Sequence, residues 1–437
     1  MTDGAADRSP TPVRDRPDVD PVDPVDPVDL SSLEFWGTPM ADRDASFAEL
    51  RAQRPVSWHR PPEGMLMPGE DDPGFWAVVR HADIVHVSKN PKIFCSGRGV
   101  QFQDAPEEVL EASQSFLAMD APRHTTLRKI VSAAFTPKQV RRIENTIVER
   151  AEMIVDDLLD HGDGDFVQLV SKRLPMWTIY DLMGLPEEYQ ESVAEAADLL
   201  VAANDPGVQE EQGIDDPLEV VGNALAALIG PGLELADARR SDPRDDLMTN
   251  LVQAEVDGES LTDAEIGAFF VLLSVAGNDT TRNTIAHTMC RLTEHPDQRD
   301  RLRADYEARI PTAVEEFVRH ASPVVTFRRT ATQDTELGGR HIAAGDKVVM
   351  FYESGNRDAE VFTDPLRFDL TRDPNPHVGF GGGGPHFCMG NMLARTQLRA
   401  IFSQLLTRVP DLSVGEPEML RSNFVHAVKR LPCSLRG

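Results

Sequence analysis

Residues 380–390 read Phe380-Gly-Gly-Gly-Gly-Pro-His386-Phe-Cys388-Met-Gly390, and this stretch decides how the chain is interpreted. It places one cysteine after a glycine-rich turn and directly before a helix-like segment, residues 391–400. Backbone N–H groups of such a turn and of a helix N-terminus favour the anionic form of the sulfur. Glycines let the backbone bend closely around the sulfur, where side chains would intrude. The pattern predicts a metal-binding thiolate; the alternative is a surface loop with a chance cysteine.

These residues resemble the haem-binding signature of the cytochrome P450 superfamily, a phenylalanine and a glycine-rich loop followed by His-x-Cys-x-Gly. The resemblance implies that Cys388 is the axial ligand of haem b and that its thiolate favours O–O cleavage. It also implies that Phe380, His386 and Gly390 contact the cofactor. The commonest family spacing separates phenylalanine and cysteine by seven positions, whereas Phe380 and Cys388 are eight apart. The longer form resembles actinobacterial sterol and methyl-branched-lipid hydroxylases.

Composition indicates a soluble, cytoplasmic protein. The 437 residues are 41% hydrophobic, and 44 basic against 72 acidic residues give a net charge of -28. This charge disfavours nucleic acid or an anionic membrane as a partner. The sequence contains no stretch of 18 uninterrupted apolar residues, so it predicts no membrane span. We expect a monomer in a reducing compartment, in which Cys95, Cys290 and Cys433 are inert.

The pattern along the chain predicts a tail followed by one domain. Residues 1–30 are rich in Asp and Pro and are expected to be a disordered tail. Residues 31–437 are expected to form one mainly helical domain with small β-sheets. The resemblance covers about residues 35–435 and implies haem lying between a long central helix and the cysteine loop.

Individual elements follow from caps and periodicity. We expect a strand at 75–80, a helix from Thr136 to about Leu159, and a helical region 187–236 that is interrupted at 204–207. Thr262 and Glu265 form a capping box that opens a helix, and its apolar continuation predicts central burial. Residues 328–352 are expected to form strands with a turn at 338–339.

The expected central helix contains Ala276-Gly277-Asn278-Asp279-Thr280-Thr281. An acid followed by a hydroxyl residue is costly in an apolar interior unless something uses it. Gly277 is expected to leave room for a small ligand beside the backbone. The segment resembles the oxygen-activation motif of the family, which implies that Ala276 borders the cofactor and that Asp279 and Thr280 are catalytic through proton delivery. The alternative is a helix kink with a satisfied polar pair.

Two further motifs resemble parts of the same family. His124 and Arg128 lie four residues apart on one expected helix face, and the resemblance implies that they bind haem propionates together with His386 and Arg329. The neighbouring Arg328 leaves the choice between the two arginines open, because strand neighbours point to opposite faces.

The Glu-x-x-Arg pair, Glu316 and Arg319, resembles two members of the family's Glu-Arg-Arg triad. The resemblance implies that Arg367 is the third member. By the same resemblance this network is structural and stays outside the chemistry.

The substrate pocket is less readable. Apolar side chains near the expected distal side suggest a lipophilic substrate, although core packing explains them equally well. The expected substrate contacts are Leu272, Val275, Ala276, Val324, Val325 and Phe424.

The implied reaction is insertion of one oxygen atom from O2 into a C–H bond of a sterol, branched fatty acid or terpenoid. Electrons would come from a separate ferredoxin and ferredoxin reductase. A basic patch could dock an acidic ferredoxin, or could be a solvated helix face; its residues are Lys138, Arg141, Arg142, Arg395 and Arg399. Alternatives are a tailoring hydroxylase of a macrolide or other secondary metabolite, a non-catalytic haem-thiolate sensor, and a metal-free helical interaction module.

Overall fold

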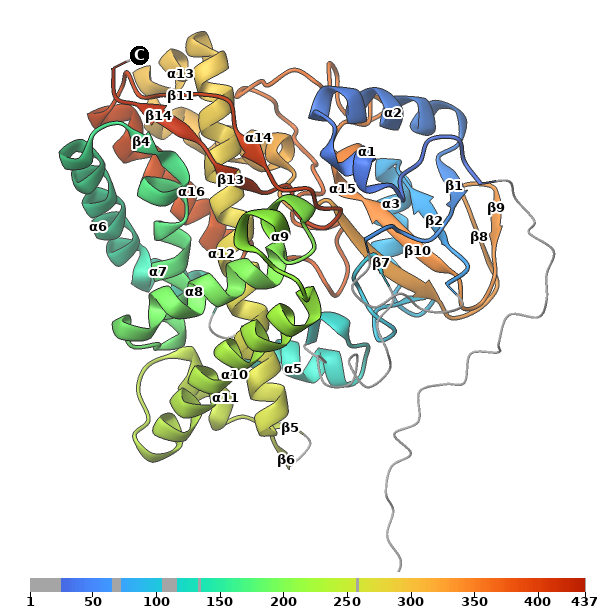
Figure 1. Cartoon of the computed structure of the whole chain (residues 1–437), viewed down its shortest axis with the longest axis horizontal. Helices are drawn as coiled ribbons and strands as arrows, with labels where there is room; N and C mark the ends of the chain where they lie inside the picture. Colours follow the sequence, from blue (N-terminus) through green and yellow to red (C-terminus); the bar gives the residue numbers. More distant parts are fainter. Residues whose placement is uncertain (1–24, 65–71, 104–115, 133–134, 257–258, 437) are drawn as a thin grey trace, which may run out of the picture.

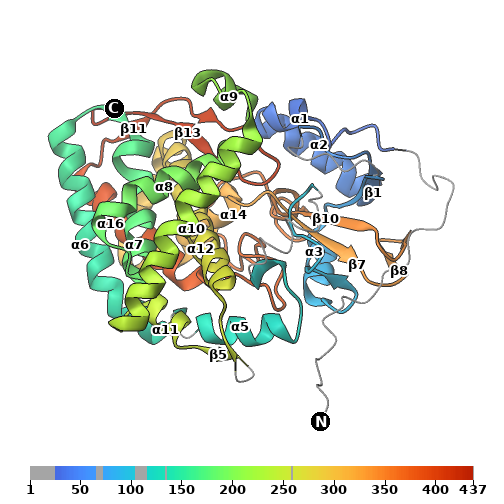
Figure 2. The same ribbon diagram turned by 60° about the horizontal axis from the view of Figure 1, so that its bottom comes forward.

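The computed structural model describes residues 25–64, 72–103, 116–132, 135–256 and 259–436. Most helices gather on one side of the molecule, and a sheet with two N-terminal helices lies on the other (Figure 1 and Figure 2). The long helix α12 (Asp263–Glu294) runs through the helical side. The expected mainly helical fold with small sheets is confirmed.

Helix α12 begins at the predicted capping box. The Thr262 N–H donates to Glu265 Oε2 (2.9 Å), and the Glu265 N–H donates to Thr262 Oγ1 (3.3 Å). Its apolar first half is buried against α7 (Arg173–Met183), α8 (Glu187–Ala202), α10 (Pro217–Ser241) and α14 (Tyr306–Ala321). Because both ends of the cap are satisfied and the helix is apolar nearly all round, it forms the axis of the helical side.

Helix α6 (Pro137–His161) shows how the surrounding helices follow from the sequence. Thr136 caps it, Pro137 occupies its first position, and Gly162 ends it with a φ of 85°. One stripe of its side chains packs against α16 (Asn391–Arg408) and α7. The prediction of a helix from Thr136 to about Leu159 is confirmed.

The region 187–236, expected as one interrupted helical stretch, forms α8, α9 (Pro206–Gln212) and α10. Asp205 caps α9 by accepting the N–H of Gly207 (2.6 Å), and Asp216 caps α10 by accepting the N–H of Leu218 (2.9 Å). Among the described residues, α10 is the one helix whose length and mean hydropathy of 1.3 would allow a membrane span. It packs along α8 and α12.

The main sheet has the strand order β1 (Val56–His59), β2 (Phe75–Val78), β10 (Lys347–Phe351), β7 (Thr326–Ala331) and β3 (Phe94–Cys95). Strands β2 and β10 are parallel, and the other pairs are antiparallel. The predicted turn joins β8 (Thr335–Leu337) to β9 (Arg340–Ile342), with φ values of 56° and 77° at Gly338 and Gly339. Two positive φ values suit a two-residue hairpin, which explains both glycines.

The remaining elements connect these parts. The helices are α1 (Leu33–Gly37), α2 (Met40–Gln53), α3 (His81–Lys89), α5 (Arg123–Ser132), α11 (Leu247–Val252), α13 (Pro296–Ala304), α15 (Tyr352–Gly355), a 3-10 turn (Phe116–Ala118) and a π-helical turn (Val167–Ser171). The short strands are β4 (Gly164–Asp165), β5 (Glu255–Val256), β6 (Glu259–Ser260), β11 (Ser413–Val414), β12 (Glu418–Met419), β13 (Val428–Arg430) and β14 (Pro432–Ser434).

The boundary of the expected tail needs a correction. Residues 1–24 lie outside the described residues, but 25–30 are folded, contrary to the assignment of 1–30 as a tail. Leu30 is fully buried, the Asp26 N–H donates to the Trp58 carbonyl (2.9 Å), and Arg54 pairs with the Asp26 carboxylate (2.5 Å). Residues 19–29 repeat Val-Asp-Pro. Arg54 and Arg60, on either side of β1, pair with Asp26 and Asp29, and the last part of this repeat therefore packs onto the sheet.

Candidate functional site

The cysteine loop is held by backbone hydrogen bonds and close packing. The Cys388 N–H donates to the Phe380 carbonyl (2.9 Å), and α16 begins three residues after the cysteine. A Cβ on Gly384, whose φ is 74°, would lie 2.1 Å from the Ser88 carbonyl oxygen of α3. A Cβ on Gly382 would lie 2.5 Å from Ser88 Oγ. These glycines therefore allow the loop to approach α3, and not, as the sequence suggested, the sulfur.

Two opposing effects act on the sulfur of Cys388. Burial raises the pKa of the Cys388 thiol, while the Gly390 N–H and the charges of Arg128 and Arg395 oppose that rise. Desolvation therefore outweighs the backbone groups that were expected to favour the anion. A thiolate here needs a bound cation to compensate its burial. Among the described residues no three His, Cys, Asp or Glu side chains cluster as metal ligands.

The predicted propionate donors lie together on one side of the loop. The rings of His124 on α5 and His386 are 4.2 Å apart, and His386 Nε2 lies 3.1 Å from Ser96 Oγ. His124 Nε2 and His386 Nδ1 are buried without a hydrogen-bond partner. Burial lowers the pKa of both imidazoles, and the charge of Arg329 adds to this effect. Unpartnered donors of this kind fit the propionates of haem, which need hydrogen bonds when buried.

The structure distinguishes between the two neighbouring arginines of β7. Arg328 donates to the carbonyls of Arg98 (2.6 Å) and Gln103 (3.2 Å). Arg329 is 5% exposed, and its charge acts on His124 and His386. Within the described part of the chain no carboxylate pairs with Arg329. Of the two arginines, Arg329 is therefore the one whose charge acts on both histidines.

The catalytic candidates on α12 face different ways. Thr280 Oγ1 donates to the Ala276 carbonyl (3.0 Å), and Thr280 is half-buried while Ala276 is exposed. Leu272, Val275 and Ala276 share this face because they are three and four residues apart. The helix is thus open along the face that carries the predicted ligand contacts, although its flanking positions are buried.

Asp279 belongs to a buried chain of charges between α12 and α8. Arg282 donates to Asp279 Oδ1 (2.5 Å) and to Asp198 Oδ1 (2.6 Å), and Asp279 Oδ2 is buried without a partner. The side chains of Asp279, Arg282 and Asp198 are 2%, 10% and 36% exposed, so the chain leads outward. Burial raises the pKa of Asp279 to about 7. Sequence reasoning found Asp279 but missed its two partners. Arg282 lies one helical turn after Asp279, and this spacing could have indicated the pair. Asp198 is distant in the sequence and could not be found that way.

Gly277 has a different role from the one expected. A Cβ at this position would lie 2.6 Å from Cγ1 of Ile179 on α7. The glycine therefore lets α7 approach α12, and does not open space for a ligand on that side.

The predicted Glu-Arg-Arg network is present with a different third arginine. Arg319 makes two bonds of 2.7 Å to the fully buried Glu316. The third cation is Arg372, whose Nε lies 3.2 Å from Glu316 Oε2. Arg367 is exposed and contributes only its carbonyl, which accepts from Arg319 (3.1 Å) and Arg372 (3.2 Å). Spacing alone could not choose between two arginines on one irregular segment.

The predicted substrate contacts divide into two groups. Val324 and Phe424 are half-buried, and the Phe424 ring lies 5.7 Å from the ring of Phe327, which the sequence analysis did not include. Val325 is 1% exposed and packs into the cluster around Trp36. The placement of Val325 does not fit a ligand contact, because its side chain is enclosed by core residues.

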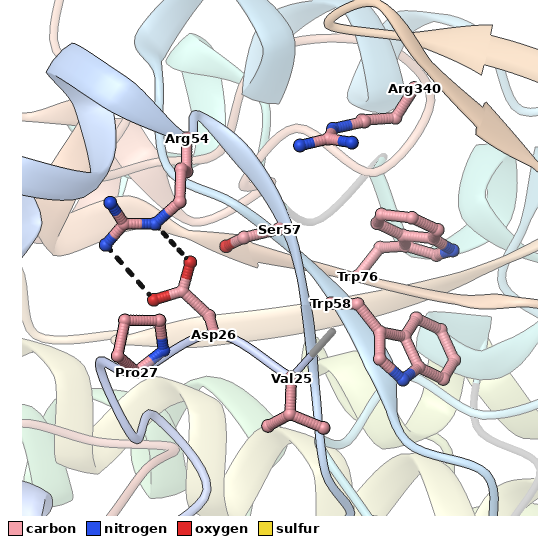
Figure 3. A pocket seen from close by; sticks show the side chains of 8 residues that line it. All are labelled: Val25, Asp26, Pro27, Arg54, Ser57, Trp58, Trp76 and Arg340. Carbon is pink, nitrogen blue, oxygen red and sulfur yellow. Dashed lines mark hydrogen bonds and ion pairs between the residues drawn. The ribbon is translucent and has the colours of Figure 1, made fainter. Parts of the chain in front are cut away.

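A separate pocket lies where the N-terminal segment crosses the sheet edge (Figure 3). It holds about 120 Å³, below the roughly 300–1,000 Å³ of typical small-molecule sites. The residues that line it are Val25, Asp26, Pro27, Arg54, Ser57, Trp58, Trp76 and Arg340. None of the predicted site residues is among them.

Comparisons with known proteins agree with this geometry. A family model described as cytochrome P450 matches residues 233–410. The methyl-branched lipid omega-hydroxylase of Mycobacterium tuberculosis is 43% identical over 414 residues, covering 92% of this chain and 93% of the relative. The steroid C26-monooxygenase of Mycolicibacterium smegmatis is 40% identical, covering 89% and 90%.

A solved structure extends the similarity to the whole fold. A Mycobacterium marinum cytochrome P450 in complex with pseudoionone is 56% identical and superimposes with a TM-score of 0.92. The match covers 95% of this chain and all of that chain. Fold, motif order and overall sequence identity agree, and the chain therefore belongs to the cytochrome P450 family.

Proposed function

We propose that this haem-dependent monooxygenase hydroxylates a methyl-branched lipophilic substrate, such as a branched fatty acid, a sterol side chain or a terpenoid. One observation carries the proposal. Cys388 is half-buried, and the charge of Arg128 acts on it. The adjoining rings of His124 and His386, 4.2 Å apart, each carry a buried nitrogen without a hydrogen-bond partner. The names of the relatives support the substrate class: a methyl-branched lipid hydroxylase, a steroid monooxygenase and a structure with pseudoionone bound.

The roles of the residues follow from their positions. When bound, haem supplies the oxygen chemistry of the family, which needs O2, two electrons and two protons. Cys388 would hold the haem iron, and Phe380 and Gly390 lie at the two ends of the cysteine loop. His124, Arg128, Arg329 and His386 would bind its propionates. The apolar side chains of Leu272 and Val275 would exclude water and orient the substrate.

Proton delivery is assigned to one oxygen of Asp279. Arg282 holds Oδ1, so the unpartnered Oδ2 is the atom that can carry a proton. Its pKa of about 7 suits exchange near neutral pH. Thr280 donates to the Ala276 carbonyl, and its hydroxyl oxygen can accept a hydrogen bond on its open side. The two side chains thus offer a buried proton donor and a hydroxyl group on the open face of α12.

A spectral titration of the ferric protein tests the substrate class. Sterols, methyl-branched fatty acids, terpenes and macrolides would each be added to the purified protein. We expect a low- to high-spin shift with branched lipids, because an apolar ligand displaces the water on iron. A spin shift with macrolides alone would contradict the proposal and indicate a tailoring hydroxylase of macrolides. A spectrum unmoved by every compound would remove support for free lipids and favour a carrier-bound substrate.

The ligand assignment has its own test. We expect Cys388→Ser to lose the thiolate-type spectrum of the reduced CO complex. Cys433→Ser serves as the control, because this cysteine is buried on β14 away from the loop. An unchanged spectrum in Cys388→Ser would refute the assignment.

We propose that a ferredoxin and its reductase supply the electrons. The predicted basic patch is smaller than expected, because Arg395 pairs with Glu315 and Arg142 with Asp245. Lys138, Arg141 and Arg399 remain exposed on α6 and α16. Charge reversal at these three positions should slow electron transfer at low ionic strength and have less effect at high salt. Electron-transfer rates that change neither with charge reversal nor with ionic strength would exclude this docking surface.

We also propose that the protein acts as a cytoplasmic monomer. The contacts of α10 with α8 and α12 support its place in the globular fold. Sedimentation of the full chain, with and without lipid vesicles, should show one species of about 48.3 kDa that does not bind the vesicles. A dimer or vesicle-bound protein would contradict this proposal.

A further inference from the structure

Glu315 and Arg395 form a two-point ion pair behind the cysteine loop. Arg395 Nε lies 2.6 Å from Glu315 Oε1, and Nη2 lies 2.8 Å from Oε2. Both side chains are about one quarter exposed. His377 Nε2 lies 3.1 Å from Glu315 Oε2. Burial raises the pKa of Glu315, but hydrogen bonds from Arg395 and His377 outweigh it and lower the pKa to about 2, so the carboxylate stays charged.

Arg395 connects this pair to both ends of the loop. Its guanidinium centre lies 4.4 Å from the centroid of the Phe380 ring. Its Nη1 donates to Asn391 Oδ1 (2.7 Å), and Asn391 Nδ2 donates to the Cys388 carbonyl (2.7 Å). The Cys388 N–H in turn donates to the Phe380 carbonyl (2.9 Å). The loop is therefore fixed to α14 through one side chain.

This arrangement is separate from the neighbouring buried network. Glu316 is fully buried and binds Arg319, Arg372 and Asn375, away from the cysteine. Glu315 is the adjacent residue on α14, yet its carboxylate faces α16. Two consecutive glutamates thus serve two different segments, and only the first reaches the loop.

We propose that Glu315 and Arg395 are positioning residues that hold the Cys388 loop and set the local charge beside its sulfur. The inference rests on the proposed assignment of Cys388 as the haem ligand. Arg395 brings a positive charge near the sulfur, and Glu315 offsets that charge. A partly buried pair is screened less than a surface pair, so each charge would act on the Cys388 sulfur and on the haem iron that it would bind.

The ferric–ferrous reduction potential of the holoenzyme tests the electrostatic part. Arg395→Gln removes a positive charge and should shift the potential negative, because the more positive ferric state becomes easier to maintain. Glu315→Gln should shift it positive, since Arg395 then acts without its counter-charge. The double variant should return toward wild type. The control is Arg408→Gln, on the same helix as Arg395. It breaks an exposed pair with Asp156 of α6 and should leave the potential unchanged.

The thiolate-type spectrum of the reduced CO complex tests the positioning part. In mild urea, Arg395→Gln should lose this band about fivefold faster than wild type, a factor that corresponds to about 1 kcal/mol. Arg395→Lys keeps the charge but not the fork or the ring contact, so it should retain the potential and still lose the band faster.

Two results would overturn the inference. One is a shift of the same sign in Arg395→Gln and Glu315→Gln, and the other is band loss that matches Arg408→Gln in every variant. Failure of the ligand assignment is distinguishable, since Cys388→Ser would then keep the thiolate-type band.

Discussion

At the scale of single residues, Asp279 depends on partners that lie outside its own motif. Its Oδ1 is held by Arg282, which also binds Asp198 on α8, while Oδ2 has no partner. Thr280, the next residue, points its hydroxyl to the backbone one turn earlier. The acid and the alcohol are therefore adjacent in sequence but held by different contacts, and their contributions can be separated by mutation.

Thr280→Ala is expected to keep haem and substrate binding but to divert electrons to hydrogen peroxide. Product formation should fall by about 10- to 100-fold, less than the full effect of general acid catalysis because water can replace the hydroxyl. The measurement is the amount of hydrogen peroxide and of hydroxylated product formed for each electron pair consumed. Thr293→Ala is the control, because Thr293 makes the same back-bond to Met289 (2.9 Å) farther along α12. Tight coupling in Thr280→Ala would refute the role in proton delivery.

Asp279 should also make stability depend on pH. Burial raises its folded-state pKa from 3.8 to about 7, so the folded protein binds this proton more tightly than the unfolded chain. Its stabilising contribution is complete below pH 3.8 and is lost as pH rises through about 7. We compare the free energy of unfolding of wild type with that of Asp279→Asn at each pH. The difference between the two proteins should change by about 1 kcal/mol or more between pH 3.8 and about 7, because wild type loses stability as pH rises. Parallel urea-denaturation profiles for the two proteins would contradict this.

At the scale of elements, close approach between helices explains a glycine that the motif assigned to ligand binding. Gly277 meets Ile179, so α7 and α12 touch where any side chain would separate them. The same reasoning applies to Gly382 and Gly384, which bring the cysteine loop against α3. Packing between elements accounts for these three glycines.

Gly277→Ala should lower the free energy of unfolding by about 1–3 kcal/mol through overpacking. The second-site change Ile179→Val, which trims the side chain in the way, should restore part of this loss. Gly222→Ala on α10 is the control, because a Cβ there meets nothing within 4 Å and alanine should be neutral or stabilising. Chemical denaturation measures all four proteins, and equal losses in both alanine variants would exclude the packing explanation.

At the scale of the whole molecule, the N-terminal segment from residue 25 closes the sheet side of the fold. Leu30 is fully buried in the cluster that contains Trp36, Phe47 and Phe351. Trp36 Nε1 donates to the Leu30 carbonyl (2.9 Å), and Arg54 holds Asp26. A segment that composition assigned to a tail is thus part of the core.

A chain that begins at residue 25 should therefore be more stable than one that begins at residue 32. The difference should be about 2 kcal/mol or more, the contribution of one buried leucine and its hydrogen-bonded neighbours. Leu30→Ala in the full chain should show a loss of similar size. Thermal unfolding measures the three proteins, and identical midpoints would place the boundary of the folded domain after residue 31.

Features that depend on neighbouring residues could be predicted from the sequence. The cysteine loop, the capping box at Thr262, the long apolar helix and the Gly338-Gly339 turn are local patterns of caps, periodicity and backbone freedom. Their physical basis is hydrogen bonding and sterics within a few residues, which the sequence states directly. The family resemblance followed from the order of such motifs.

Contacts between distant side chains could be learned from the folded chain alone. It selected Arg372 over Arg367 beside Glu316 and Arg329 over Arg328 beside the histidines. It also paired Arg395 with Glu315, enclosed Val325 in the core and folded residues 25–30 onto the sheet. The reason is that charge and apolar character specify what kind of partner a side chain needs. Which partner it finds depends on how helices and strands far apart in the chain pack together.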